Sequence, residues 1–404
     1  MAHLLGEPLR ALDLCNGSGA SCGRMLSVLG VEVVKVEPPG GDRGRSGHEA
    51  GGASDFSWLA YNTGKKSVVI DLTDEEGKIH FLQLADEASF IIESFPPGYL
   101  DRLGVGYEVL SQRNPRVILT SISPFGADGP YSNYIGSDIT ILAMGGLLAQ
   151  SGEPDRAPLR FSVAQTEPLS GAQAAAAMLI AHESRAQTGV GQHIDLSVQE
   201  AVLAADFVQQ QNWDILRENS PRTGVFHDRG GVKMRLIFDC ADGFISWRLM
   251  FGAHGYMTRA LVDWMAEENE AGELQKVDWD ILDIRTLAQD DVDLYESTVS
   301  MFFGQRTKST LYQGAVERGV VLFPVNTAPD ILSEAQLAYR QFWHRITQPL
   351  IGMSVRVPDR PFLVNGVRQE EAQLSAPILG EHQADFPPQD KRLFSHIRTQ
   401  PEVV

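Results

Sequence analysis

The fold is decided first by residues 9–36, LRALDLCNGSGASCGRMLSVLGVEVVKV. Two short apolar runs, 9–14 and 31–36, flank a glycine-rich turn and a helical stretch that extends to Leu29. A strand, a helix and a second strand in this order form a right-handed βαβ unit, in which the two strands are parallel. We therefore predict that the chain begins with a parallel sheet.

The same alternation continues along the chain. We expect further strands at 67–71, 89–93 and 117–121, and helices at 75–86, 107–112, 172–184 and 198–213. Strands that alternate with helices are typical of a sheet covered by helices on both faces. The predicted fold class is α/β, with a Rossmann-like, doubly wound parallel sheet.

The length of the chain and a change of character after Ser220 indicate two domains. A chain of 404 residues exceeds what one hydrophobic core normally supports. An irregular passage with Pro221, Gly224 and two further glycines precedes a new expected strand at 234–239. We predict a large domain over 1–224 and a smaller α/β domain over 225–325.

Composition excludes several classes of function. The chain has 43% hydrophobic and 21% charged residues, which is ordinary for a globular protein. It lacks an apolar run of membrane-spanning length and a signal peptide, so we expect a cytoplasmic protein. The net charge of −18 argues against nucleic acid as a partner, and an anionic ligand would need a local cluster of cations. Three cysteines without metal-ligand spacing are expected to be reduced thiols, and no metal site is predicted.

The turn Gly17-Ser18-Gly19 precedes the first expected helix. Glycines here could let the backbone approach an anionic ligand at the helix start, and a tight structural turn explains them equally well. The full dinucleotide fingerprint is absent, so a nicotinamide cofactor is not expected.

One carboxylate stands out in the stretch FSVAQTEPLSG at 161–171. We expect Glu167 at the N-cap of a long helix and Pro168 at its first helical position, since a residue before proline is pushed out of the α region. The helix dipole would keep this carboxylate ionised at a strand-to-helix corner, where α/β enzymes often place active sites. An ordinary acidic cap is the alternative.

Several motifs stand in the order and spacing of family III (CaiB/BaiF-type) CoA-transferases, and the chain resembles that family over nearly its whole length. The motifs are GVEVVKVEPP at 30–39, Asn62 with KKSVVIDL at 65–72, IESFPPGYLDRLG at 92–104, TGVGQHIDLS at 188–197, CADG at 240–243 and APILGEH at 376–382. The resemblance implies an interlocked dimer, a segment at 326–404 that returns to the large domain, and coenzyme A or acyl-CoA as substrate rather than as a permanently bound cofactor.

The resemblance also implies catalytic roles. Family members use an aspartate as nucleophile, and Glu167 stands at the matching position. Such a carboxylate attacks a thioester, and nearby N–H donors hold the oxyanion. The helix start or the turn at 229–231 could supply these donors. Asp138 could orient the nucleophile or position the acceptor acid, or it could cap the helix from Ile139.

For CoA, the resemblance implies Arg102 as a phosphate ligand, with a surface ion pair to Asp101 or Glu108 as the alternative. Lys65 and Lys66 would lie near the 3′-phosphate or adenine end, unless they form a solvated turn. The resemblance also implies that the segment with Ser94 and Phe95 contacts the phosphates and pantetheine of CoA, and that the turn at Gly17 contacts CoA.

Departures from the family pattern concentrate in this site. Ser94 replaces an asparagine, Pro96 a basic or small residue, Ser137 an aromatic residue or histidine, and Gly19-Ala20-Ser21 the usual Ala-Gly-Pro. Some family members, such as the one that transfers CoA from succinyl-CoA to benzylsuccinate, pair two paralogous subunits of which one carries the aspartate. With glutamate at 167, the chain resembles the aspartate-less subunit, which would act with an aspartate-bearing partner.

Three alternatives remain open. The first is a homomeric CoA-transferase with Glu167 as nucleophile. The second is a related α-methylacyl-CoA racemase. Such an enzyme needs an acid and a base on opposite faces of the substrate carbon, whereas Ser137 and Glu167 here replace the expected histidine and aspartate. The third is a structural partner that binds no CoA. His193, inside an expected strand, is expected to be a packing residue.

Overall fold

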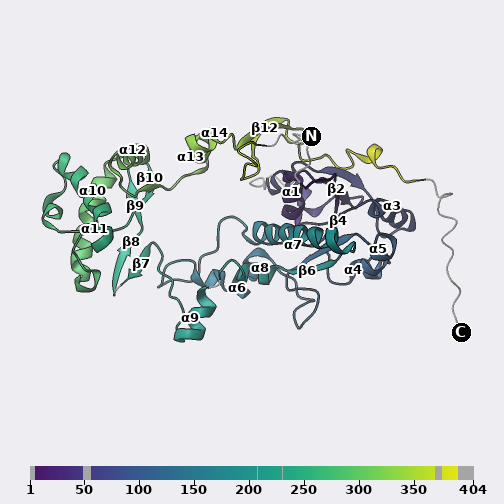
Figure 1. The fold of residues 1–404 in the computed structure, drawn as a ribbon, viewed down its shortest axis with the longest axis horizontal. Coiled ribbons are helices and arrows are strands. Elements are labelled where there is room, and N and C mark those ends of the chain that lie inside the picture. Colours follow the sequence, from purple (N-terminus) through teal and green to yellow (C-terminus); the bar gives the residue numbers. More distant parts are fainter. Residues whose placement is uncertain (1–4, 49–55, 207, 230, 369–374, 390–404) are drawn as a thin grey trace. The chain divides into compact units, whose positions relative to one another are not determined.

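The computed structural model describes residues 5–48, 56–206, 208–229, 231–368 and 375–389. The chain divides into two compact units (Figure 1). The first unit contains 1–148, 160–217 and 338–404, and the second contains 149–159 and 218–337. The predicted small domain at 225–325 lies inside the second unit, which also includes 149–159, a segment that the sequence did not assign to it.

A six-stranded parallel sheet organises the first unit. Its strands are β1 (Arg10–Asp13), β2 (Glu32–Glu37), β3 (Lys66–Val69), β4 (Phe90–Glu93), β5 (Ile118–Ser123) and β6 (His193–Ser197). Their order is β3-β2-β1-β4-β5-β6, so the winding reverses between β1 and β4. The predicted α/β class with a doubly wound parallel sheet is confirmed, whereas the interlocked dimer stays a prediction.

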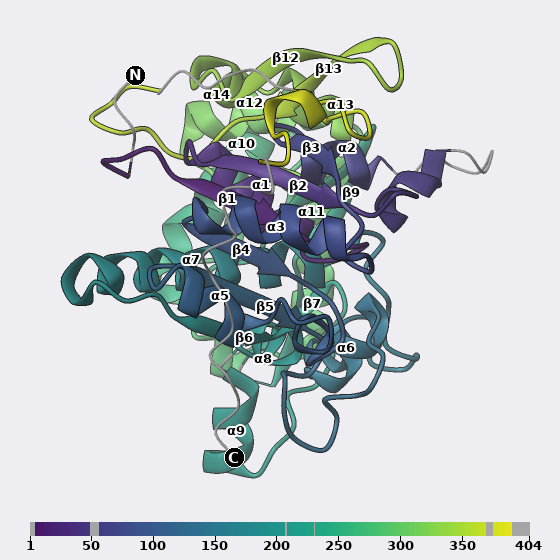
Figure 2. The same ribbon diagram turned by 90° about the vertical axis from the view of Figure 1, so that its right-hand side faces the viewer.

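Helices cover both faces of this sheet. The helices along 20–216 are α1 (Ala20–Val28), α2 (Ser57–Asn62), α3 (Glu75–Asp86), α4 (Tyr99–Arg102), α5 (Tyr107–Arg113), α6 (Asp138–Met144), α7 (Thr166–Thr188), α8 (Val198–Leu203) and α9 (Val208–Leu216). Figure 2 shows α3 and α5 in front of the sheet, where Phe81 and Leu110 pack on Leu12 and Ile91. The opposite face carries α1 and α7 on Ala11 and its neighbours. Alternate side chains of each strand therefore enter different cores.

The single helix expected at 198–213 is wrong, because the chain forms α8 and α9 instead. After α8 the N–H groups of Ala205 and Asp206 bond three residues back rather than four, to Val202 and Leu203. The Asp206 side chain then accepts the Val208 N–H at 3.2 Å. A short acidic side chain that bonds nearby backbone competes with the helical ladder, which explains the break.

The second unit has its own core and small antiparallel sheets. Its strands are β7 (Phe226–Arg229), β8 (Val232–Arg235), β9 (Ile237–Cys240), β10 (Gly243–Ser246) and β11 (Phe323–Pro324), and its helices α10 (Gly255–Glu267), α11 (Gln289–Gly304), α12 (Lys308–Arg318) and α13 (Ala328–Ser333). The expected strand at 234–239 divides at Leu236, since β8 pairs with β7 and β9 pairs with β10. Phe238, Trp247, Trp264 and Phe303 fill the core.

The last part of the chain packs against the first unit's edge strand. After α14 (Ala335–Tyr339), β12 (Trp343–Gln348) and β13 (Met353–Pro358) form a hairpin. Further on, the His382 N–H bonds the Ser67 carbonyl at 2.9 Å, and the Val69 N–H bonds the Gln383 side chain at 2.8 Å. The short 3₁₀ helices are Arg43–His48, Leu147–Gln150, Gly252–His254, Gly272–Lys276, Ile284–Thr286 and Gln383–Asp385. Among the described helices, none is both long and apolar enough to cross a membrane.

A glycine sets the distance between α1 and α7. A Cβ atom at Gly171 would lie 2.0 Å from Ser21 Oγ and 2.8 Å from the Cys22 nitrogen. We expect Gly171→Ala to destabilise the protein by about 1–3 kcal/mol in chemical denaturation, since one of the helices must move. Gly304→Ala is the control, because a Cβ at this helical glycine meets no atom within 4 Å. Equal unfolding free energies for the two variants would contradict this close approach.

Glu296 of α11 gives a pH prediction. Burial raises the pKa of Glu296 from 4.5 to about 7. The hydrogen bond from the Arg235 N–H favours the ionised form and opposes this rise, but burial outweighs it. A carboxyl group whose pKa is raised by folding stabilises the fold below its unfolded pKa, and this contribution is lost as the pH rises through the folded pKa.

Glu296→Gln should therefore gain unfolding free energy relative to the wild type as the pH rises from about 4.5 to about 8, measured by urea denaturation. Glu273→Gln, at an exposed residue paired with Lys276, is the control and should show no such trend. A constant difference between Glu296→Gln and the wild type across this range would refute the prediction.

Candidate active site

The candidate site lies at the turn between β1 and α1. Gly19 adopts φ +81°, and a Cβ there would lie 2.8 Å from Cys15 Sγ, so only glycine fits. The turn leads directly into the first N–H groups of α1, which have no acceptor within their own helix. These groups therefore face outward as donors for an anion.

Glu167 supplies that anion. Its Oε2 accepts the Gly19 N–H and its Oε1 accepts the Ser21 N–H, both at 2.9 Å. The Ser21 hydroxyl also donates to the Glu167 carbonyl at 2.6 Å. The carboxylate of α7 thus caps the start of a different helix, α1.

The expected N-cap position of Glu167 is wrong, because α7 begins at Thr166 and has Gln165 as its N-cap. Pro168 is consequently the third residue of the helix. Proline fits there because the first-turn N–H groups have no helical partner in any case.

Asp138 caps α7 from a distance along the chain. It is the first residue of α6, and its Oδ1 accepts the N–H groups of Gln165 at 2.8 Å and Thr166 at 2.9 Å. The Thr166 hydroxyl donates to the same oxygen at 3.0 Å. Asp138 therefore fixes the start of the helix that carries Glu167. The alternative in which it caps the helix from Ile139 is wrong, because α6 begins at Asp138 and has Ser137 as its N-cap. A role in orienting the nucleophile or positioning the acceptor acid stays a prediction.

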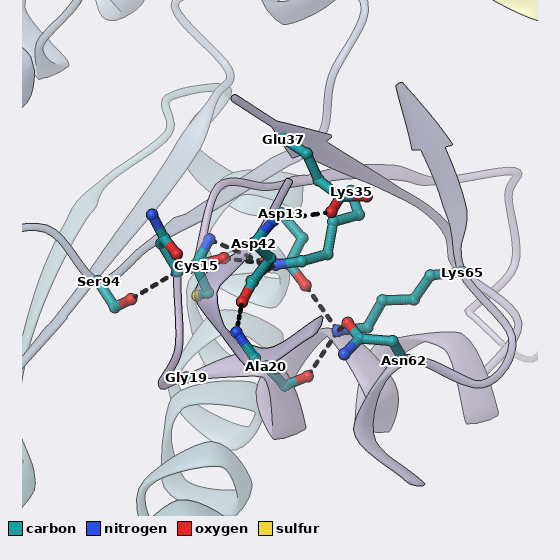
Figure 3. A network of polar contacts seen from close by, with 12 residues as sticks. Asp13, Cys15, Gly19, Ala20, Lys35, Glu37, Asp42, Asn62, Lys65 and Ser94 are labelled. Carbon is teal, nitrogen blue, oxygen red and sulfur yellow. Dashed lines mark hydrogen bonds and ion pairs between the residues drawn. The ribbon is translucent and has the colours of Figure 1, made fainter. Parts of the chain in front are cut away.

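Buried charged side chains support the turn between β1 and α1 (Figure 3). Lys65 donates to Asp13 Oδ2 and to the Ala20 carbonyl, both at 2.7 Å, and to Asn62 Oδ1 at 3.0 Å. Lys35 pairs with Asp42 at 2.8 Å and bonds the Cys15 carbonyl. Both lysine side chains are fully buried.

Asp42 completes the support, because its Oδ1 accepts the Gly17 N–H at 3.1 Å. Glu37 in turn accepts the Asp42 N–H at 3.1 Å and pairs with Arg45 at 2.6 Å. The contact predicted at Gly17 is therefore occupied by a side chain of the protein itself.

The charges in this network determine its protonation. Burial alone would raise the pKa of Asp13, but Lys35 and Lys65 hold it below its ordinary value. Burial lowers the pKa of Lys65, whereas Asp13 and Asp42 outweigh burial at Lys35 and raise its pKa.

The thiols nearby are not nucleophiles. Cys15 and Cys22 are free and buried. Burial and the charge of Asp13 raise the pKa of both thiols far above neutrality. A thiol must ionise to attack, so neither cysteine is suited to act as a nucleophile.

Lys65 does not lie where a CoA phosphate could reach it. Its ammonium is enclosed by three oxygen atoms of the protein, and no part of the side chain is exposed. Lys66 is partly exposed and pairs with Glu32 at 2.8 Å, beneath the ring of Phe386. The structure thus gives the two neighbouring lysines different environments.

Ser94, Phe95 and Arg102 lie together after β4. The Ser94 hydroxyl donates to the Ser18 carbonyl at 2.8 Å and accepts the Asn16 N–H at 3.2 Å, which joins this segment to the glycine turn. Arg102 is exposed, lies over the Tyr99 ring and donates to a backbone carbonyl at 3.3 Å. In the described part of the chain, no ion pair joins it to Asp101 or Glu108.

The remaining predicted residues belong to other elements. His193 begins β6, contacts the Ser121 hydroxyl at 2.9 Å and stacks on Tyr107. Arg229 and Gly231 belong to the second unit, and Gly230 lies outside the described residues. The described residues contain no group of three or more His, Cys, Asp or Glu side chains arranged to hold a metal ion.

Sequence reasoning missed Asp13, Lys35 and Asp42. A signal existed, because Asp13 and Lys35 interrupt otherwise apolar strands, and a charge in a buried strand needs a partner. Asp42 carried no such signal. It lies in the turn after β2, where acidic residues are common.

The chain is similar to known proteins over most of its length. The model of CoA-transferase family III matches residues 7–383. The succinyl-CoA:(R)-benzylsuccinate CoA-transferase subunit BbsE of Thauera aromatica is 33% identical over 380 residues, 92% of this chain and 91% of that protein. The succinyl-CoA:glutarate CoA-transferase of Mus musculus is 29% identical over 381 residues, 93% and 84% of the two chains. A CAIB/BAIF family protein from Brucella suis has a TM-score of 0.77 and 26% identity, and the match covers 94% of this chain and 98% of that one.

The two adjacent lysines provide a test of the buried network. We expect Lys65→Ala to reduce the unfolding free energy by roughly 3–5 kcal/mol, because it leaves Asp13 with less compensation in the interior. Lys66→Ala is the control and should cost below about 1 kcal/mol, since a partly exposed pair contributes little. If Lys65→Ala kept full stability and lost only CoA affinity, the phosphate role would stand and the structural role would fail.

Proposed function

The chain belongs to CoA-transferase family III, and we propose that it is the subunit without a catalytic aspartate in a heteromeric enzyme. This enzyme moves CoA from a succinyl-CoA-like donor to a carboxylic acid. An aspartate-bearing paralogue is the partner. Two observations support the proposal: the names of the relatives and the contacts of Glu167.

The relatives support the donor and the heteromer. Succinyl-CoA is named for BbsE, for the mouse enzyme and for a D-citramalate CoA-transferase of Chloroflexus aurantiacus, which is 35% identical over 57% of each chain. BbsE is itself named as a subunit, and it matches this chain over nearly its full length. An acid of the benzylsuccinate kind is therefore the acceptor class that we test first.

The contacts of Glu167 carry the proposal. Each of its two carboxylate oxygens accepts a backbone N–H of the α1 start. Hydrogen bonds to an anion stabilise it and reduce its tendency to attack a carbonyl carbon. The glutamate therefore acts as a cap of α1, and the nucleophile comes from the partner.

The reaction itself needs a carboxylate that forms two covalent intermediates. The carboxylate attacks the donor thioester, expels CoA thiolate and becomes an acyl anhydride. The thiolate then attacks the carbonyl carbon of the protein's own carboxyl group, which gives a protein-bound CoA thioester and releases the donor acid. The acceptor carboxylate reverses these two steps and leaves as acyl-CoA, with the protein carboxylate restored.

A homomeric enzyme with Glu167 as nucleophile is the second candidate. The favouring observation is that the Gly19 and Ser21 N–H groups already touch the glutamate oxygens. When thiolate attacks the Glu167 carbonyl carbon, the oxyanion forms on one of these oxygens, and the two donors are placed to stabilise it. A racemase has no such support, since the Ser137 hydroxyl contacts Thr140 within the capping turn of α6.

Glu167→Gln separates the two candidates. We expect the chain alone to show no turnover with succinyl-CoA and benzylsuccinate, and its complex with an aspartate-bearing paralogue to be active. Glu167→Gln in this chain should leave the rate of the complex within about threefold, because an amide oxygen still accepts one N–H. Acyl exchange is followed by chromatography of the CoA thioesters.

Glu75→Gln is the control, at an exposed glutamate in the first turn of α3. Robust turnover by the chain alone that Glu167→Gln abolishes and Glu75→Gln preserves would sink the heteromer and establish the second candidate. An inactive complex with intact CoA binding would leave this chain with a binding role only.

A further inference from the structure

An open cavity of about 290 Å³ lies beside the ends of β4 and β5 and beneath the segment that follows β4. Its walls include Glu93, Phe95, Tyr107, Ser121, His193 and Asp195. Glu93, Ser121 and Asp195 are aligned across β4, β5 and β6 by the strand register. The transfer reaction described above does not use Glu93, although Glu93 is the most deeply buried of these three residues.

Glu93 bonds the backbone of the segment above it. The residue is 7% exposed, and its Oε2 accepts the Phe95 N–H at 2.6 Å. Phe95 follows only two residues later, so the carboxylate turns back and fixes the direction in which the chain leaves β4. A hydrogen bond to an ionised acceptor is short and about twice as strong as a neutral one.

The segment that Glu93 holds has other anchors, among them Leu100, which is buried in the core. Ser94 is tied to the glycine turn through Asn16 and Ser18. The Phe95 ring packs on Tyr99 at 4.7 Å, and Arg102 lies over the same Tyr99 ring. The position of the Arg102 guanidinium therefore depends on Tyr99, which depends on Phe95, whose backbone depends on Glu93.

We propose that Glu93 is a positioning residue that sets the affinity of this chain for CoA by fixing the backbone at Phe95. The proposal rests on the proposed function and on the CoA contacts that the family resemblance implied for Ser94, Phe95 and Arg102. Glu93 itself lies under the segment and touches no ligand. Its contribution is to hold three contact residues in one arrangement before CoA arrives, which lowers the ordering cost of binding.

The surroundings of Glu93 show that an uncharged acceptor can also hold the Phe95 N–H. Burial raises its pKa to about 7, and the charges of Asp101 and Asp195 add to this rise, against the bonds from Ser121 and Phe95. Both protonation states are therefore populated near neutral pH, and both keep an oxygen that accepts the Phe95 N–H. A glutamine has the same reach and an equivalent oxygen.

The test measures the dissociation constant for free CoA by calorimetry, with the chain alone and in complex with its paralogue. We expect Glu93→Ala to weaken binding by about tenfold or more, the loss that follows from one charge-assisted hydrogen bond. Glu93→Gln should stay within about threefold of the wild type. Glu93→Asp keeps the charge but shortens the reach, and should resemble Glu93→Ala.

Asp195→Ala is the matched control. Asp195 lines the same cavity and also holds a loop backbone, since both its oxygens accept the Ala127 N–H at 2.9 and 3.1 Å. It does not touch the CoA segment, so its removal should leave the dissociation constant unchanged. Melting temperatures of all variants separate lost folding from lost affinity.

The outcomes distinguish a failure of the positioning role of Glu93 from a failure of the proposed function. If the wild type binds CoA and Glu93→Ala or Glu93→Asp binds it equally well, the positioning role is refuted and the proposed function stands. The same conclusion follows if Glu93→Gln binds as weakly as Glu93→Ala. If the wild-type chain binds no CoA, alone or in complex, the proposed CoA site fails and the role of Glu93 fails with it.

Discussion

The burial of two lysines against two aspartates beneath the turn after β1 is the constraint on which the candidate site depends. Lys35 and Lys65 are fully enclosed, and Asp13 and Asp42 balance their charges. A buried charge without its partner is costly, so none of the four can be lost alone. The same two ammonium groups also bind the carbonyls of Cys15 and Ala20, at the two ends of the turn. With these two carbonyl groups directed to the lysines, the turn and the start of α1 present the N–H groups of Gly19 and Ser21 to Glu167.

The other half of the site is fixed by contacts between helices. Asp138 caps α7, the Ser21 hydroxyl bonds the Glu167 carbonyl, and Gly171 lets α1 approach α7 closely. The backbone of Glu167 is therefore held from both sides before its side chain makes any contact. Its carboxylate meets the start of α1 because three segments that are distant in sequence converge there, not because of the helix to which it belongs.

Local sequence patterns predicted the helices and strands whose formation depends on neighbouring residues. They failed for Glu167 and Lys65, whose contacts come from segments distant in sequence. The helix expected at 75–86 matches α3 in both bounds, and each apolar run expected as a strand of the sheet lies within about two residues of one, because alternation and capping are local. Glu167 was expected to cap its own helix, since local rules consider only one helix at a time. Two adjacent lysines suggest a solvated turn, yet Lys65 is buried, because Asp13 and the Ala20 carbonyl, both distant in sequence, accept its ammonium.

The length of the side chain at position 167 determines how completely the carboxylate caps α1. With the backbone fixed, an aspartate would hold its oxygens about 1.5 Å farther from the Gly19 and Ser21 N–H groups, and it could not accept both at hydrogen-bond distance. The glutamate spans the gap and satisfies one donor with each oxygen. The extra methylene thus completes the helix cap, which supports the proposal that the partner subunit performs the covalent chemistry.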